Sequence, residues 1–135
     1  MINNLSIMLI DDNVIDLFLN KKFIEAHKLA NKTTKFEDSH EAFQYLHSAS
    51  AADWPNLILL DIHMPIMDGF EFLELYNTLP IENREKTNII MLSSSILMSD
   101  NEKVLKYPSV IAFLTKPLNI TELVQLLKDK GIIKP

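Results

Sequence analysis

Hydrophobic residues along the chain follow two alternating patterns. Short apolar or β-branched runs have the length and composition of β-strands. They lie at about residues 5–10, 33–37, 56–60, 88–92 and 110–114. Between these runs, apolar residues recur at the spacing of an α-helix. The helical segments are residues 13–29, 40–48, 70–79, 99–107 and 121–131. The pattern therefore predicts five strands that alternate with five helices.

Capping residues support the first and last of these helices. In the first, Ile15, Phe18, Leu19 and Phe23 lie on one helical face, and Asn13 stands where an N-cap is expected. In the last, residue 119 (Asn) or 121 (Thr) supplies the cap, and a glycine at 131 stops the helix.

The alternation of strands and helices predicts an α/β fold with a parallel sheet, because a short right-handed crossover joins parallel neighbours. Near-continuous apolar strands indicate that helices cover both faces. A five-stranded sheet of this size favours the flavodoxin-like order 2-1-3-4-5. Ligands of such a sheet bind at the carboxyl ends, beside the switch point between strands 1 and 3.

Composition narrows the class of protein. The 135 residues, 47% hydrophobic, suit one domain over residues 1–135. A net charge of −5 with scattered Lys and Arg argues against a nucleic-acid surface and favours a protein partner. The absence of cysteine suits a reducing compartment. The N-terminal apolar run is too short for a membrane span and lacks a basic start, so we expect a soluble, cytoplasmic protein.

Polar residues follow several of the predicted strands and should meet at one edge of the sheet. Asp61 ends the third strand, and Asp11 and Asp12 follow the first. Lys116 follows the fifth strand, and Ser93 begins a run of three serines after the fourth. Close carboxylates repel by roughly 1 kcal/mol in water and about 4 kcal/mol near a protein surface, so a cation is needed. Mg²⁺ suits oxygen ligands and leaves positions for phosphate, and Lys116 with a serine hydroxyl adds the donors that stabilise a phosphoryl group.

Each of these residues alone has a simpler interpretation. The pair of Asp11 and Asp12 is typical of a helix cap, and Asp61 alone is typical of a solvated strand end. Asp16 has the pattern of a solvated helix charge. The side chain of His63 has no second histidine or cysteine at ligand spacing. It is the combination with Lys116 that favours a phosphate-handling site.

Four motifs together carry a resemblance to a known family. The segments "LIDDN", "LLDIHMPIMDG", "LSSS" and "LTKPL", in this order, resemble the receiver domain of two-component response regulators over essentially the whole chain. The resemblance implies that Asp61 accepts a phosphoryl group from a histidine kinase or phosphotransfer protein. It implies that Asp12 binds Mg²⁺ directly, that Asp11 holds it largely through water, and that the backbone carbonyl of His63 completes the protein ligands.

The same resemblance implies a switch. Ser93 matches the switch hydroxyl, Phe113 the switch aromatic residue and Lys116 the family's lysine, whose bond to Pro117 is cis in that family. The downstream protein target would bind the face formed by the fourth helix, the fifth strand and the fifth helix. The chain departs from the family before its fifth strand, where "KYPSVIAF" replaces the usual Gly-Ala pair. Phe113 also lacks the hydroxyl of a tyrosine.

Three functions from different classes remain open. The first is a stand-alone phosphoacceptor, either a terminal switch or a phosphorelay carrier. Such a protein is a signalling protein rather than an enzyme, although it phosphorylates itself from phosphoryl donors and dephosphorylates itself. This function is favoured because the chain ends at Pro135. The second is a Mg²⁺-dependent aspartyl-phosphate hydrolase of the haloacid-dehalogenase type, which needs a second acid where His63 stands. The third is a docking module, which would have lost Asp12, Asp61 or Lys116.

Overall fold

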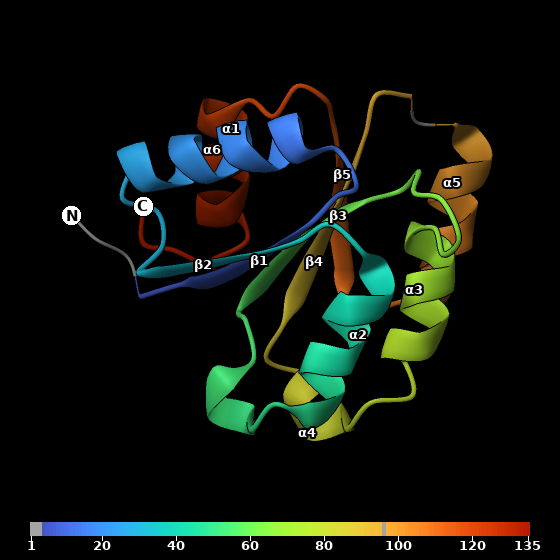
Figure 1. The fold of residues 1–135 in the computed structure, drawn as a ribbon. Coiled ribbons are helices and arrows are strands. Elements are labelled where there is room, and N and C mark those ends of the chain that lie inside the picture. The colour runs from blue at the N-terminus through green and yellow to red at the C-terminus, as the bar shows by residue number, and fades with distance from the viewer. Residues whose placement is uncertain (1–3, 96) are drawn as a thin grey trace.

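The computed structural model describes residues 4–95 and 97–135 and forms a five-stranded parallel sheet between two layers of helices (Figure 1). The strand order is β2-β1-β3-β4-β5, as the sequence predicted. The strands are β1 (Ser6–Ile10), β2 (Lys32–Phe36), β3 (Leu57–Asp61), β4 (Asn88–Ser93) and β5 (Val110–Thr115). Each strand begins and ends within one residue of its predicted run.

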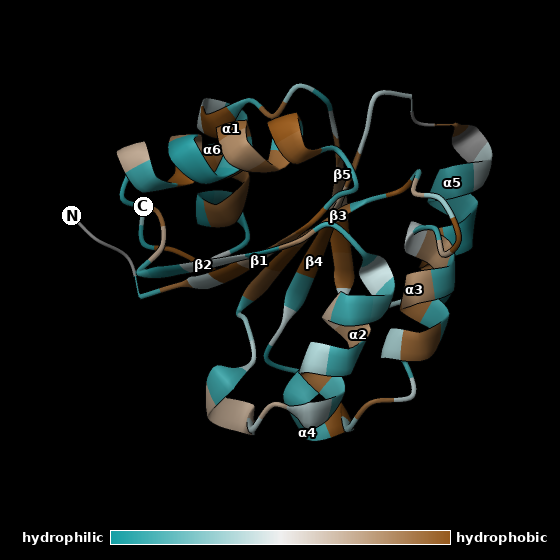
Figure 2. Cartoon of the chain, viewed as in Figure 1, coloured by the Kyte–Doolittle hydropathy of each residue, from teal (hydrophilic) through white to brown (hydrophobic). Residues whose placement is uncertain are grey.

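The central strands are buried because both faces of the sheet carry a hydrophobic core. Alternate side chains of a strand point to opposite faces. In β3, for example, Ile58 and Leu60 belong to one core cluster, whereas Leu57 and Leu59 belong to the other. The central strands are accordingly the most continuously hydrophobic part of the chain, whereas the edge strand β2 is largely hydrophilic (Figure 2).

The helices lie on both faces of the sheet, as expected for right-handed crossovers. Those with eight or more residues are α1 (Val14–Ala26), α2 (Ser39–Ser48), α3 (Gly69–Tyr76) and α6 (Ile120–Asp129). Helices α1 and α6 share one face, and α2 and α3 share the other (Figure 1). The shorter α5 (Met98–Lys103) lies on the side of α3. No helix of the described residues is long and apolar enough to span a membrane.

The predicted caps of the first and last helices are present. The Asn13 side chain accepts hydrogen bonds from the backbone N–H groups of Ile15 and Asp16, at 3.0 and 3.1 Å. Asn119 accepts one from the N–H of Glu122 at 3.0 Å, so it, rather than the threonine at 121, is the N-cap of α6. Gly131 follows this helix with φ 73°, which a residue with a side chain rarely adopts.

Helix α1 does not pack on the sheet through the face that its apolar spacing indicated. Ile15, Phe18, Leu19 and Phe23 are between 38% and 67% exposed. The buried residues of α1 are instead Leu17, Asn20 and Ile24. Apolar residues occur on more than one side of this helix, so their spacing could not decide which side meets the sheet. The outer side of α1 therefore carries an exposed apolar stripe, which consists of Val14, Ile15, Phe18, Leu19 and Phe23.

Three short elements differ from the sequence prediction. A 3₁₀ turn, η1 (Ala51–Asp53), precedes β3, and a single helical turn, α4 (Ile81–Arg84), precedes β4. The segment predicted as one helix over residues 99–107 is divided into α5 and a 3₁₀ turn, η2 (Val104–Lys106). Elements of one turn bury too few residues to produce a readable hydrophobic period.

Candidate functional site

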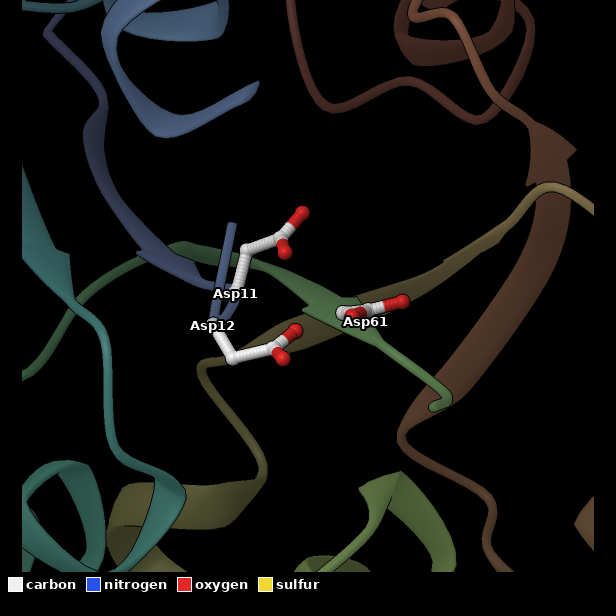
Figure 3. Close-up of side chains that lie close together, drawn as sticks. All are labelled: Asp11, Asp12 and Asp61. Atoms are coloured by element: carbon white, nitrogen blue, oxygen red, sulfur yellow. The ribbon is translucent and has the colours of Figure 1, made fainter. Parts of the chain in front are cut away.

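The strand order brings three aspartates together at the carboxyl edge of the sheet. Asp61 is the last residue of β3, and Asp11 and Asp12 directly follow β1, which pairs with β3. One carboxylate oxygen from each residue lies within 4.8 Å of the others (Figure 3). The sequence therefore predicted this cluster correctly, because parallel neighbours end at the same edge.

The three carboxylates differ in exposure. Asp11 and Asp61 are buried, with 3% and 4% of their surface exposed, whereas Asp12 is exposed. Asp11 Oδ1 accepts a hydrogen bond from the Asn13 N–H at 2.9 Å. Asp11 Oδ2 is buried and has no hydrogen-bond donor among the described residues. It forms an ion pair with Lys116 whose geometry is not that of a hydrogen bond.

Lys116 supplies the positive charge of the cluster. It directly follows β5, and its backbone N–H donates to the Ser93 carbonyl at 2.8 Å, while its bond to Pro117 is cis. Its Nζ lies 2.7 Å from Asp11 Oδ2 and 3.4 Å from Asp61 Oδ1. Burial alone would lower the pKa of the Lys116 ammonium, but the neighbouring carboxylates outweigh burial and hold this pKa above its usual range. Lys116 therefore stays charged.

Asp61 has a strongly perturbed pKa. Burial and the negative charge of Asp11 raise the pKa of its carboxyl from 3.8 to about 7, against the opposing effects of Lys116 and of the His63 N–H. Among the described residues, the donors that face Asp61 are this N–H, 3.4 Å from Oδ1, and the Lys116 amine. A cation bound beside Asp61 would therefore favour its ionised form.

The pKa of Asp61 predicts how stability depends on pH in the absence of divalent cations. Between about pH 4 and pH 7 the folded protein holds a proton on Asp61 that the unfolded chain has lost. The contribution of Asp61 to the free energy of unfolding should be greatest below about pH 4 and fall until about pH 7. Each unit of pKa difference corresponds to about 1.4 kcal/mol.

Urea denaturation in EDTA would measure this effect against Asp61→Asn, which has the same shape and does not titrate. The variant and the wild type should be similarly stable near pH 4, and the variant should be the more stable near pH 8. A stability difference that stays constant over this range would contradict the raised pKa.

Two of the other predicted site residues, Ser93 and His63, lie at the carboxyl edge of the sheet, and the third, Phe113, lies further back in β5. Ser93 is fully buried at the end of β4, and its hydroxyl donates to the Ser95 carbonyl at 2.7 Å while accepting from the Ser95 N–H at 3.1 Å. This hydroxyl is thus engaged with its own loop. Phe113 of β5 is half-buried against the core on the side of α2 and α3. His63 is exposed.

The donor set fits a hard divalent cation. The cluster offers carboxylate oxygens from three residues, one of which, Asp11 Oδ2, is buried without a hydrogen-bond donor. Mg²⁺ prefers such oxygens and retains several waters, which the exposed side of Asp12 can accommodate. The Lys116 amine and a bound cation together would offset the repulsion between the carboxylates.

Asp16 belongs to this site, although the sequence pattern indicated a solvated helix charge. Its Oδ2 accepts a hydrogen bond from Lys116 Nζ at 3.1 Å. The two residues are a hundred positions apart and lie on α1 and after β5, so only the packing of α1 brings them together. The sequence held one indication that Asp16 could belong to the site, because Asp16 follows Asp12 by four residues, which is about one helical turn.

Comparison with known proteins agrees with this geometry. The family model of the response regulator receiver domain matches residues 7–128. A response regulator receiver protein from Dyadobacter fermentans is 37% identical, with a TM-score of 0.82, over 92% of this chain and 95% of that chain. The receiver domain of a Pseudomonas aeruginosa sensor histidine kinase, with a magnesium ion coordinated in its active-site cleft, shares the fold at 22% identity and a TM-score of 0.75, over 94% and 97% of the two chains.

A curated relative has the same kind of domain within a much longer protein. Hybrid signal transduction histidine kinase D of Dictyostelium discoideum is 32% identical over 130 residues. The match covers 91% of this chain and 8% of that kinase.

The fold and the acidic strand ends define a receiver domain of two-component signalling, a class of signalling protein that histidine kinases phosphorylate. The chain belongs to the response regulator receiver family.

Proposed function

We propose that Asp61 accepts a phosphoryl group from a phosphohistidine of a histidine kinase or phosphotransfer protein, with Mg²⁺ held by Asp11, Asp12, Asp61 and the backbone carbonyl of His63. The observation that carries this proposal is the convergence of three strand-end carboxylates at the carboxyl edge of the sheet, where the Lys116 amine contacts two of them, Asp11 and Asp61. The magnesium ion described for the Pseudomonas receiver domain supports the choice of metal.

The chain's own groups suffice to describe the transfer. An oxygen of ionised Asp61 attacks the phosphorus in line, an O–P bond forms, and the N–P bond of the donor histidine breaks. Lys116, whose amine already lies 3.4 Å from Asp61 Oδ1, would donate to a phosphoryl oxygen. When bound, Mg²⁺ would offset negative charge on the phosphoryl oxygens.

Switching would begin at the loop after β4. The Ser93 hydroxyl would leave the Ser95 carbonyl and donate to the phosphoryl group, and Phe113 would then turn inward. The output face would comprise α5, β5 and α6. Among the described strands β5 is an edge strand with most of its residues half-buried, and a groove of about 630 Å³ lies between it and α6. A protein target could use this groove.

The proposal is tested with acetyl phosphate, which needs no docking surface. In Mg²⁺ the protein should gain one phosphoryl group that hydroxylamine removes, as an acyl phosphate requires, and EDTA should prevent the gain. A docking module would gain none. A protein that released inorganic phosphate from phosphate esters over many turnovers, without accumulating the acyl phosphate on Asp61, would instead be a hydrolase.

Replacing Asp12 with alanine should remove the most exposed carboxylate of the metal site. We expect Mg²⁺ to bind at least about tenfold more weakly. Removing a group that only orients a metal ligand already weakens binding by about this factor, and Asp12 would be a ligand itself. Titration calorimetry is the suitable measurement, because tryptophan fluorescence would not report on the site. Trp54 lies before β3, where it packs against Tyr76 and donates a hydrogen bond to the Leu46 carbonyl. Glu41→Gln, an exposed acid in the first turn of α2, is the control and should bind Mg²⁺ as the wild type does.

A further inference from the structure

The Lys116 ammonium has three carboxylate partners, and one of them does not belong to the strand-end cluster. Its Nζ lies 2.7 Å from Asp11 Oδ2, 3.1 Å from Asp16 Oδ2 and 3.4 Å from Asp61 Oδ1. Asp16 comes from the first turn of α1, and its contact has the geometry of a hydrogen bond. Asp16 thus contacts the amine from the side of α1 and more closely than Asp61 does.

An ammonium group has only three N–H donors, and three carboxylates already lie within 3.4 Å of this one, of which Asp16 receives the contact with hydrogen-bond geometry. A phosphoryl group on Asp61 would bring further oxygens that need the same amine. These oxygens would compete with the three carboxylates for the amine, and the most easily replaced contact would be lost. The Asp16 side chain is 35% exposed, whereas those of Asp11 and Asp61 are 4% and 5% exposed. Asp16 is therefore the partner that water can replace most easily, because an exposed charge loses least when its ion pair breaks.

We infer that Asp16 is a positioning residue that holds the Lys116 amine toward α1 in the unphosphorylated protein and releases it when Asp61 is phosphorylated. The inference rests on the proposed function and adds a regulatory contact to the same site. Asp16 makes and breaks no covalent bond. Its effect is competition, because the free energy of the Lys116–Asp16 contact is lost on phosphorylation and so disfavours the phosphorylated state.

Removal of Asp16 should consequently favour the phosphorylated state. With acetyl phosphate and Mg²⁺ at subsaturating donor concentration, Asp16→Asn should raise the ratio of phosphorylated to unphosphorylated protein by about two- to fivefold, the size of a partly exposed ion pair. Asp16→Ser should do the same, so the result does not depend on one variant folding. Asp16→Glu, which keeps the charge and can still reach the amine, should stay nearer the wild type than either.

Glu41→Gln is the matched control for charge and for helix stability. Glu41 lies in the first turn of α2, so this variant also removes one negative charge from the start of a helix, but Glu41 has no contact with Lys116. Its phosphorylated ratio should equal that of the wild type. An equal rise in Glu41→Gln and Asp16→Asn would assign the effect to general charge and overturn the inference.

A second measurement follows the amine directly. In the unphosphorylated protein, Asp16→Asn should shift the side-chain NMR resonances of Lys116, whereas Glu41→Gln should leave them unchanged. If the wild type is phosphorylated but the Asp16 variants show an unchanged or lower phosphorylated ratio, the inference is wrong and the proposed function stands. If the wild type accepts no phosphoryl group, both are wrong.

Discussion

Replacing Asp61 with asparagine should abolish phosphorylation while leaving the protein folded. The amide keeps the shape of the side chain but lacks the anionic oxygen that forms the O–P bond. It also lacks the charge that pairs with Lys116. After incubation with acetyl phosphate and Mg²⁺, intact-protein mass spectrometry should show the added phosphoryl group on the wild type and none on Asp61→Asn.

Asp53→Asn is a suitable control, because this exposed aspartate lies in η1, before β3 begins. Its carboxylate accepts a hydrogen bond from the Ser50 hydroxyl. It should be phosphorylated to the same extent as the wild type. Retention of hydroxylamine-labile phosphate by Asp61→Asn would place the phosphoacceptor on another residue and contradict the proposed function.

Gly69→Ala should produce the largest loss of stability among the substitutions considered. Gly69 begins α3 directly behind the end of β3, and an added Cβ would lie 2.7 Å from the backbone oxygen of Asp61 and 3.0 Å from the Cα of Ile62. Both atoms belong to the backbone, so the strand end itself would have to move. We expect the free energy of unfolding to fall by about 1–3 kcal/mol or more. We also expect slower phosphorylation, because the displaced backbone carries Asp61.

Gly131→Ala separates this steric effect from the general cost of replacing a glycine. Gly131 has φ 73° and open space around its Cβ position, so alanine there should cost about 1–2 kcal/mol through backbone conformation. It should leave the phosphorylation rate unchanged. Urea denaturation and acetyl phosphate kinetics would measure both variants. If Gly69→Ala kept wild-type stability and rate, the close approach of α3 to β3 would be contradicted.

The sequence alone was sufficient to predict the sheet and the acidic cluster. The central strands β1, β3 and β4 are apolar on both faces, and β2 has β-branched residues. These signals are local, so the positions of the strands and the order 2-1-3-4-5 follow from pattern and from general rules of parallel sheets. Asp11, Asp12 and Asp61 then meet at one edge as a consequence of topology, without any knowledge of side-chain packing. The N-cap at Asn13 and the helix end at Gly131 were also predictable from the sequence, because capping is a local interaction.

The orientation of α1 was decided by the tertiary structure. Apolar residues occur around much of this helix, so its inward side depends on how Leu17 and Ile24 fit against the sheet and α6 rather than on their spacing. That rotation exposes Phe18 and turns Asp16 toward Lys116. The tertiary structure also decided which residues contact Lys116, because these residues are distant in the sequence. It likewise decided that the Ser93 hydroxyl forms a hydrogen bond within its own loop. The pattern of residues along the chain carries no information about such contacts.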